Sequence, residues 1–336
     1  MDKIMLIFAA AVAFMVTALL GFGIIPWLRK LKIGQTILDI GPKWHKSKEG
    51  IPTMGGLLFV AGTAAAFAIF ILPKLIVDIG DPSSKKLIAG FVMALSFGFV
   101  GFLDDYIKVV KKRNQGLDIK QKTLLQIVII LGYLFTVWKF EGGAPHMWAP
   151  FFGDVAMPWW AFFPFGFGVL YAAVNAVNFT DGVDGLCSSV TATASAAFIA
   201  LAYLVGQQST AVMAAALLGA CLGFLCWNHK PAKVIMGDVG ALFLGGMVVA
   251  LAYTLNAPLI LLLFGIIYVI EGLSDVIQIG YFKVTHGKRV FKMAPIHHHF
   301  ELSGWSEKKI VFIFCAVNVA GIALGYVLLK TGGYLA

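Results

Sequence analysis

Charged residues are scarce in this chain: only 13% of its 336 residues are Asp, Glu, Lys or Arg. Hydrophobic residues make up 60%, and the mean hydropathy is +0.87. This composition excludes a soluble domain of this length. Because the apolar stretches recur along the whole chain, the sequence predicts an all-α integral membrane protein.

Cysteine is also rare. The chain has four, Cys187, Cys221, Cys226 and Cys315, all within apolar segments and none with metal-ligand spacing to another. We therefore expect packed, reduced thiols and no disulfide framework. The P-loop pattern GxxxxGK[ST] is missing as well, which disfavours an ATP-driven pump.

The apolar residues form ten segments of about the length that crosses a bilayer. They cover roughly residues 4–25, 53–73, 87–103, 123–138, 158–174, 187–205, 211–227, 239–255, 258–281 and 310–329. The first has no basic region before it and no clear cleavage site, so we interpret it as a retained helix. The segment 258–281 is long enough to tilt or bend. The connecting loops are too short for a second domain, so residues 1–336 are predicted to form one polytopic domain.

Lysine and arginine are unevenly distributed among the loops. Most of the 26 lie near residues 26–52, 104–122, 228–238 and 282–309. By the positive-inside rule these loops are cytoplasmic, and an even number of spans places both termini in the periplasm. The net charge of +9 then reflects topology, and we expect no nucleic-acid partner. An aromatic stretch on the opposite side, Trp148 to Trp160, is predicted to form an interfacial belt.

Five aspartates lie on the predicted cytoplasmic side, each at the end of an apolar segment: Asp104, Asp105, Asp181, Asp184 and Asp238. Carboxylates near a membrane are costly unless something offsets their charge. Asp104 and Asp105 are adjacent and repel each other, so a divalent cation or Lys108, one helical turn away, must compensate. Asp238 alone would fit a helix N-cap. Together the five indicate a bound cation.

Polar residues recur every three positions in the loop near 175–186, which has no basic residue: Asn175, Asn178, Asp181 and Asp184. In a helix they would form one polar stripe. Gly182 and Gly185 are expected to end the helix, leaving a loop of oxygen ligands for a cation or a nucleobase. The alternative is a set of helix caps and interhelical hydrogen bonds.

Three consecutive histidines, His297 to His299, follow in the last basic loop. Adjacent residues of a helix face different directions, so phosphate contact or an acid–base role fits better than a shared zinc ion, which remains the alternative.

Carboxylates with lysines are typical of Mg²⁺-assisted phosphoryl transfer. Mg²⁺ takes only one or two carboxylates, so not all five aspartates are ligands. A transporter is the rival class, but its polar site usually lies at mid-membrane on paired repeats, and no repeat is visible here.

Several motifs together point to a known family. They are Pro52-Thr53-Met54-Gly55-Gly56, Asp104-Asp105-Tyr106, the run from Asn175 to Gly185, Met236-Gly237-Asp238 and the run from Ala294 to Glu301. Over essentially its full length the chain resembles the phospho-N-acetylmuramoyl-pentapeptide transferases, a subgroup of the polyprenyl-phosphate N-acetylhexosamine-1-phosphate transferases. The last motif is the most specific to the subgroup.

The resemblance implies ten transmembrane helices, periplasmic termini and a cytoplasmic active site in the bacterial inner membrane. It implies a Mg²⁺-dependent transfer of phospho-MurNAc-pentapeptide from UDP-MurNAc-pentapeptide to undecaprenyl phosphate, which yields lipid I and UMP for peptidoglycan synthesis. It also implies a homodimer. Whether the transfer takes one step or passes through a phospho-enzyme stays open at this point.

The resemblance also implies roles for single residues. Asp238 corresponds to the principal Mg²⁺ ligand and Asp104 to the base or nucleophile, supported by Asp105. The other catalytic positions are Lys108, Lys122 and His297. The substrate-binding positions are Lys48, Asn175, Asn178, Asp181, Asp184, Asn228, Gln278, His298 and His299. Relatives often have phenylalanine where this chain has Ile235, so the way it holds uracil remains open.

Overall fold

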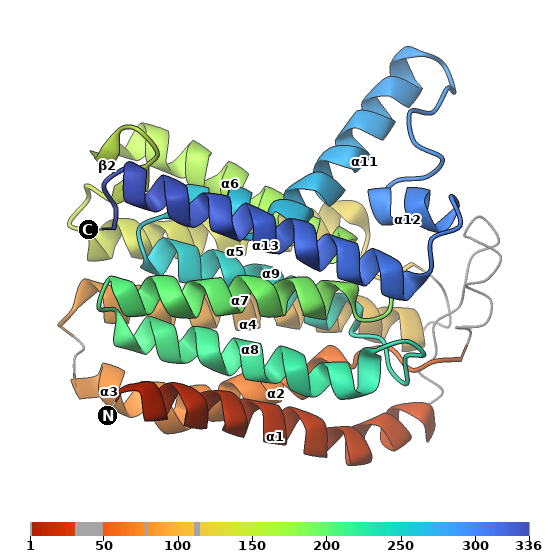
Figure 1. The fold of residues 1–336 in the computed structure, drawn as a ribbon, viewed down its shortest axis with the longest axis horizontal. Coiled ribbons are helices and arrows are strands. Elements are labelled where there is room, and N and C mark those ends of the chain that lie inside the picture. The colour runs from red at the N-terminus through yellow and green to blue at the C-terminus, as the bar shows by residue number, and fades with distance from the viewer. Residues whose placement is uncertain (1, 31–49, 78–79, 111–114, 336) are drawn as a thin grey trace.

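The computed structural model describes residues 2–30, 50–77, 80–110 and 115–335. Long helices run side by side in a bundle, and the two ends of the chain lie at the same end of it (Figure 1). The principal helices are α1 (Asp2–Lys30), α2 (Gly56–Ala66), α4 (Pro82–Val110), α5 (Ile119–Phe140), α6 (Trp159–Phe179), α7 (Leu186–Leu204), α8 (Gln208–Asn228), α9 (Gly237–Thr254), α11 (Ile266–Val284) and α13 (Glu307–Thr331). A π-helical turn, η2 (Phe67–Ile71), joins α2 to α3 (Leu72–Val77).

Eight of the ten predicted apolar segments each coincide with a single helix, and most of residues 53–73 lie in α2, η2 and α3. Among the described residues, nine helices are long and apolar enough to cross a membrane. A tenth candidate span is a bent pair of helices: η3 (Pro258–Ile260) and α10 (Leu261–Phe264) meet α11 at 87°, with Gly265 at the break. As a result α11 extends away from the bundle (Figure 1). The structure is mostly helical, as predicted, and its candidate spans fit an integral membrane protein.

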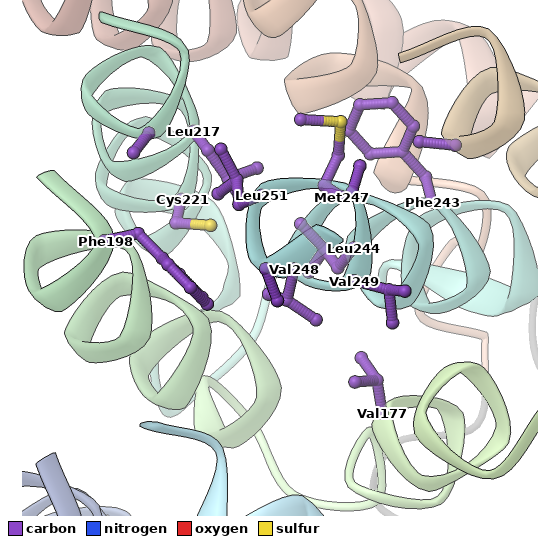
Figure 2. Packing of buried hydrophobic residues seen from close by; sticks show 14 of the residues in the cluster. Val177, Phe198, Leu217, Cys221, Phe243, Leu244, Met247, Val248, Val249 and Leu251 are labelled. Carbon is purple, nitrogen blue, oxygen red and sulfur yellow. The ribbon is translucent and has the colours of Figure 1, made fainter. Parts of the chain in front are cut away.

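Helix α9 occupies the centre of the bundle. All of its residues from Val239 to Thr254 are buried, because it is apolar on every side and carries small residues where other helices cross it. Figure 2 shows its side chains pointing in several directions, Leu251 towards Leu217 on α8 and Val249 towards Val177 on α6. Helix α9 is thus packed on several sides.

Glycines bring α9 into close contact with α4 and α2. A Cβ atom placed on Gly101 of α4 would lie 2.1 Å from the carbonyl oxygen of Asp238. One placed on Gly56 would lie 2.3 Å from the Cα of Gly240. Only hydrogen fits at these crossings, so the backbones themselves set the position of Asp238.

The aromatic stretch predicted as an interfacial belt is instead partly a packed hairpin. Strands β1 (His146–Ala149) and β2 (Gly153–Ala156) pair antiparallel, with His146 opposite Ala156. Trp148 is only 3% exposed, and its backbone N–H donates to the carbonyl of Asn256 at 2.6 Å. Trp159 and Trp160 are 64% exposed and fit a belt. The prediction is therefore wrong for Trp148, because tertiary hydrogen bonds draw it inward.

Candidate active site

Asp238 receives hydrogen bonds from three other helices. Its Oδ2 atom accepts from Lys108 Nζ of α4 at 3.0 Å and from Lys122 Nζ of α5 at 2.8 Å. Its Oδ1 atom accepts from Asn178 Nδ2 of α6 at 3.2 Å. Met236, not Asp238, holds the N-cap position of α9. The Asp238 carboxylate therefore does not act as a simple helix cap.

Asp104 and Asp105 lie in the last two turns of α4, not in a loop as the apolar pattern suggested. Lys108 Nζ lies 2.6 Å from Asp104 Oδ2 and 3.6 Å from Asp105 Oδ1, as the one-turn spacing predicted. Asp104 Oδ1 also accepts the N–H of Leu117 at 2.9 Å. Asp105 Oδ2 accepts the N–H of Val239 at 3.1 Å, which ties α4 to the start of α9.

Three carboxylates converge at this point. Oxygen atoms of Asp104, Asp105 and Asp238 all lie within 4.8 Å of one another. When all three carboxylates are ionised, their charge together with that of Lys108 and Lys122 sums to one net negative charge. Hard carboxylate oxygens of this kind fit Mg²⁺, which prefers oxygen ligands and keeps several waters. We refer to these three aspartates with Lys108 and Lys122 as the acid–lysine cluster.

The members of the acid–lysine cluster differ in exposure. The side chains of Lys108, Lys122 and Asp238 are 32%, 24% and 17% exposed, while those of Asp104 and Asp105 are 4% and 3% exposed. A ligand arriving from solvent therefore meets the two ammonium groups and Asp238 first. Asp104 lies just beneath them.

The two predicted asparagines of α6 have different partners. Asn178 reaches Asp238, whereas Asn175 pairs with Gln126 of α5 and donates to the carbonyl of Tyr171 at 2.8 Å. Gln126, 2% exposed, was missed by sequence reasoning. The sequence feature that could have revealed Gln126 is a lone amide side chain within an apolar segment, one helical turn beyond Lys122.

The predicted nucleotide-side residues join two loops. Asn228 Oδ1 accepts the N–H of Gly185 at 3.0 Å, and Asp184 Oδ2 accepts the N–H of Ala232 at 3.1 Å. Glu307 at the start of α13 accepts from the N–H of Asp184 at 3.3 Å and from Lys230 Nζ at 2.6 Å. Asp181 is partly exposed in the same loop. The structure thus shows Asp184 and Asn228 in protein contacts, and their role toward a nucleotide stays a prediction.

Gly182 and Gly185 end the helical stripe as expected. Helix α6 stops at Phe179 and α7 begins at Leu186. Gly185 has a φ of +78°, a left-handed conformation that glycine adopts at little cost.

His297 is completely buried. It lies on the short helix α12 (Ile296–Glu301), and its Nδ1 atom is 3.0 Å from Glu271 Oε2 of α11. A Cβ atom on Gly182 would lie 2.1 Å from its Nε2 atom. The imidazole thus packs between α11 and the loop that follows α6, separate from the acid–lysine cluster's own contacts. Its predicted catalytic role stays a prediction.

Gln278 and His299 contact the segment before α12, whereas His298 pairs with a residue of α12 itself. His298 Nδ1 lies 2.7 Å from Glu301 Oε2, and His299 Nδ1 accepts the N–H of Lys292 at 3.1 Å. Gln278 Oε1 accepts the N–H groups of Val290 and Phe291 at 3.1 and 3.0 Å. In the described part of the chain, no group of three or more metal-ligating side chains includes a histidine.

The first motif pairs with the segment that precedes α9. Gly55 and Gly56 donate their N–H groups to the carbonyls of Ile235 and Met236, each at 2.9 Å. A Cβ atom on Gly237 would lie 2.4 Å from Asp105 Oδ2. These glycines therefore serve close packing around Asp238. Lys48, predicted to bind substrate, lies outside the described residues.

A helical membrane bundle with an acid–lysine cluster at one end of its helices is the arrangement expected of a membrane transferase, and comparisons with known proteins agree. The model of glycosyl transferase family 4 matches residues 87–256, and phospho-N-acetylmuramoyl-pentapeptide-transferase signature 1 matches residues 48–60. Phospho-N-acetylmuramoyl-pentapeptide-transferase of Desulforamulus reducens is 43% identical over 332 residues, covering 96% of this chain and 97% of the relative. The enzyme of Listeria monocytogenes is 44% identical over 322 residues, covering 96% of this chain and 97% of the relative. That of Clostridium perfringens is 44% identical over 315 residues, covering 94% of this chain and 95% of the relative.

The chain therefore belongs to the phospho-N-acetylmuramoyl-pentapeptide-transferase family. Its apolar helices and its relatives fit a multi-pass protein of the bacterial inner membrane.

Proposed function

We propose that the protein transfers phospho-N-acetylmuramoyl-pentapeptide from UDP-MurNAc-pentapeptide to undecaprenyl phosphate, forming lipid I and UMP. Family membership over nearly the whole chain supports the reaction. The observation that carries it is the convergence of Asp104, Asp105 and Asp238 with two lysines. Carboxylates and ammonium groups together suit a diphosphate substrate and a divalent cation. The distribution of Lys and Arg among the loops supports a cytoplasmic position for this cluster.

A Mg²⁺ ion would be held by Asp238, with an oxygen of Asp104 or Asp105 within reach. The three carboxylates supply the hard oxygen ligands, and their excess of negative charge over the two lysines favours the binding of a cation. Once bound, the ion would neutralise charge on the diphosphate. The side-chain amide of Asn178 donates to Oδ1 of Asp238 and so orients that carboxylate.

Asp104 is the proposed general base. It accepts the remaining proton of undecaprenyl phosphate, whose oxygen then forms a bond to the β-phosphorus of the UDP substrate. The bond from that phosphorus to the bridging oxygen breaks, and UMP leaves with the electron pair. Lys108 Nζ lies 2.6 Å from Asp104 Oδ2, so a positive charge stands beside the carboxylate that accepts the proton.

The lysines and Asp105 have supporting tasks in this scheme. Lys108 and Lys122 are more exposed than the carboxylates of the cluster, so they neutralise phosphate charge as it develops on the leaving group. Asp105 is engaged by the N–H of Val239 and by Lys108, and it therefore holds the start of α9 in place.

One assay tests the function. Purified protein in lipid nanodiscs would receive undecaprenyl phosphate, Mg²⁺ and either UDP-MurNAc-pentapeptide or UDP-GlcNAc, and UMP and lipid product would be measured. We expect product only from the first donor. Product only from UDP-GlcNAc would place the protein in the sister class, and none from either donor would overturn the proposal.

A second measurement tests the one-step route. The protein would be incubated with UDP-MurNAc-pentapeptide and Mg²⁺ without lipid acceptor, and its intact mass would be recorded. We expect an unchanged mass. A covalent phospho-MurNAc-pentapeptide adduct on Asp104 would establish the two-step route instead.

A further inference from the structure

We infer that Gln126 and Asn175 form a positioning pair that aligns Lys122 and Asn178 on Asp238. Gln126 Nε2 donates to Asn175 Oδ1 at 3.4 Å, and Asn175 Nδ2 donates to Gln126 Oε1 at 3.0 Å. The two amides thus bond each other reciprocally across α5 and α6. The inference rests on the proposed function for its catalytic consequence, but the pair itself is a feature of the helix interface.

Helical spacing connects this pair to the acid–lysine cluster. Gln126 lies four residues after Lys122 on α5, and Asn175 lies three residues before Asn178 on α6. At these spacings the two residues of each helix share one face, about one turn or 5.4 Å apart along the axis. The amide pair therefore lies one turn deeper in the bundle than the contacts to Asp238.

The two contacts above the pair need a defined geometry. Lys122 donates to Oδ2 of Asp238, and Asn178 donates to Oδ1 of the same carboxylate. The two donors come from different helices, so the orientation of that carboxylate depends on how α5 and α6 are aligned. A shift of one helix along the other by one residue, about 1.5 Å, would misplace one of them.

A reciprocal amide pair fixes this alignment better than apolar packing does. Leucine or methionine side chains fill space but tolerate sliding, whereas two opposed hydrogen bonds are lost together when either helix shifts or rotates. Gln126 is 2% exposed, so an unpaired amide there would have no water to bond. Asn175 is further restrained by its bond to the Tyr171 carbonyl of its own helix.

Near-isosteric variants test the inference. Gln126→Met keeps the length of the side chain and removes its amide. We expect kcat to fall about ten- to a hundredfold with little change in KM for the nucleotide substrate, because the alignment of charged groups is lost while the binding surface remains. Thr136→Val is the matched control: it removes a polar group from the same helix, but that hydroxyl bonds only the carbonyl of Gly132 within α5.

A side-chain exchange separates positioning from simple loss of a buried amide. Gln126→Asn shortens one partner and Asn175→Gln lengthens the other, so each single variant mismatches the pair. The double variant restores the combined length and all four polar atoms. We expect each single variant to lower kcat and the double variant to recover at least half of the wild-type value.

A readout without turnover completes the test. The rise in melting temperature on adding Mg²⁺ would be measured for each variant, and we expect Gln126→Met to lose most of it while Thr136→Val keeps it. Inactive wild-type protein would defeat the proposed function, and this Mg²⁺ response would then decide the positioning inference alone. The inference is overturned if Gln126→Met matches Thr136→Val, or if the exchange is no better than the worse single variant. If Gln126→Met fails to fold, the exchange series decides between positioning and a structural role.

Discussion

At the scale of single residues, the negative charge of the acid–lysine cluster is shared unequally. Asp104 and Asp105 have backbone N–H partners as well as Lys108, whereas Asp238 relies wholly on side chains from other helices. Asp238 is also the most exposed of the three carboxylates. It is therefore the carboxylate best placed to exchange its lysine partners for a cation.

Replacing Asp238 tests this view. We expect Asp238→Asn to lower the rate of UMP release at least a hundredfold, because the cation loses its main anionic ligand. The fold should persist, since asparagine keeps an oxygen for the lysines. Asp154→Asn on the exposed hairpin, where the side chain is 65% exposed, is the control for the chemical change. Near-normal turnover by Asp238→Asn at ordinary Mg²⁺ would exclude Asp238 as a metal ligand.

Lys108 carries a second prediction, because it touches all three carboxylates. In Lys108→Gln the cluster would hold two excess negative charges instead of one. We expect a loss of about 1–3 kcal/mol in stability without Mg²⁺, less than for a fully buried pair because Lys108 is 32% exposed. Mg²⁺ should restore more stability to this variant than to the wild type.

Thermal unfolding with EDTA and with Mg²⁺ measures this difference. Lys139→Gln serves as the control, because Lys139 lies over the rings of Phe135 and Trp138, away from the carboxylates. An equal Mg²⁺ response in Lys108→Gln and the wild type would mean that Lys108 does not balance the cluster's charge.

Local contacts of single residues were predictable, and distant ones were not. Lys108 lies within one turn of Asp104 and Asp105, so spacing alone paired them. Gln126 and Asn175 are 49 residues apart, and only the packing of α5 on α6 brings them together. The direction of His297 depends on a six-residue helix that hydropathy does not reveal.

At the scale of elements, the contact between α4 and α9 sets the geometry of the site. Gly101 allows α4 to pass the Asp238 carbonyl with no side chain between them. Three residues further along α4 is Asp104, so the crossing also fixes where Asp104 meets Asp238. A wider crossing would separate the carboxylates.

Widening that crossing is a third prediction. Because a Cβ atom at Gly101 would lie 2.1 Å from the Asp238 carbonyl oxygen, Gly101→Ala should force the helices apart. We expect a stability loss of about 1–3 kcal/mol from overpacking and a clear fall in kcat. Gly132→Ala on α5 is the matched control, since no atom lies within 4 Å of its added methyl group.

The control should be neutral or slightly stabilising, because alanine favours helices over glycine. Melting temperature and UMP release are measured for both variants. If Gly101→Ala behaved like Gly132→Ala, the close approach of α4 to α9 would not determine the site.

Hydropathy located the elements but not their irregularities. Eight of the ten apolar segments matched single helices, because burial in lipid demands long apolar runs with all backbone groups bonded internally. Charged residues at helix ends hid the true lengths, so α4 continues to Val110 although the apolar run stops at residue 103. The 87° bend at Gly265 and the hairpin depend on tertiary packing, which one-dimensional patterns do not encode.

At the scale of the whole molecule, the two termini share one end of the bundle, and α12 lies towards the opposite end (Figure 1). Along the sequence, basic loops alternate with loops of low charge. Residues 26–52, 104–122 and 282–309 carry most of the lysines and arginines, and the loops between them carry few. Translocating a basic loop is unfavourable, so we expect these loops to remain in the cytoplasm.

Orientation in the membrane is the fourth prediction. Alkaline phosphatase, which is active only in the periplasm, would be fused after Ala336 or, in a second fusion, inserted at the turn near His286. We expect activity from the first fusion and none from the second, because the turn at His286 lies in a basic loop whereas the last span returns the chain to the other side. Fusions of green fluorescent protein, which fluoresces only in the cytoplasm, should give the reverse pattern. Phosphatase activity at His286 would place the acid–lysine cluster in the periplasm, where a cytoplasmic nucleotide donor cannot reach it, and the proposed function would fail with the topology.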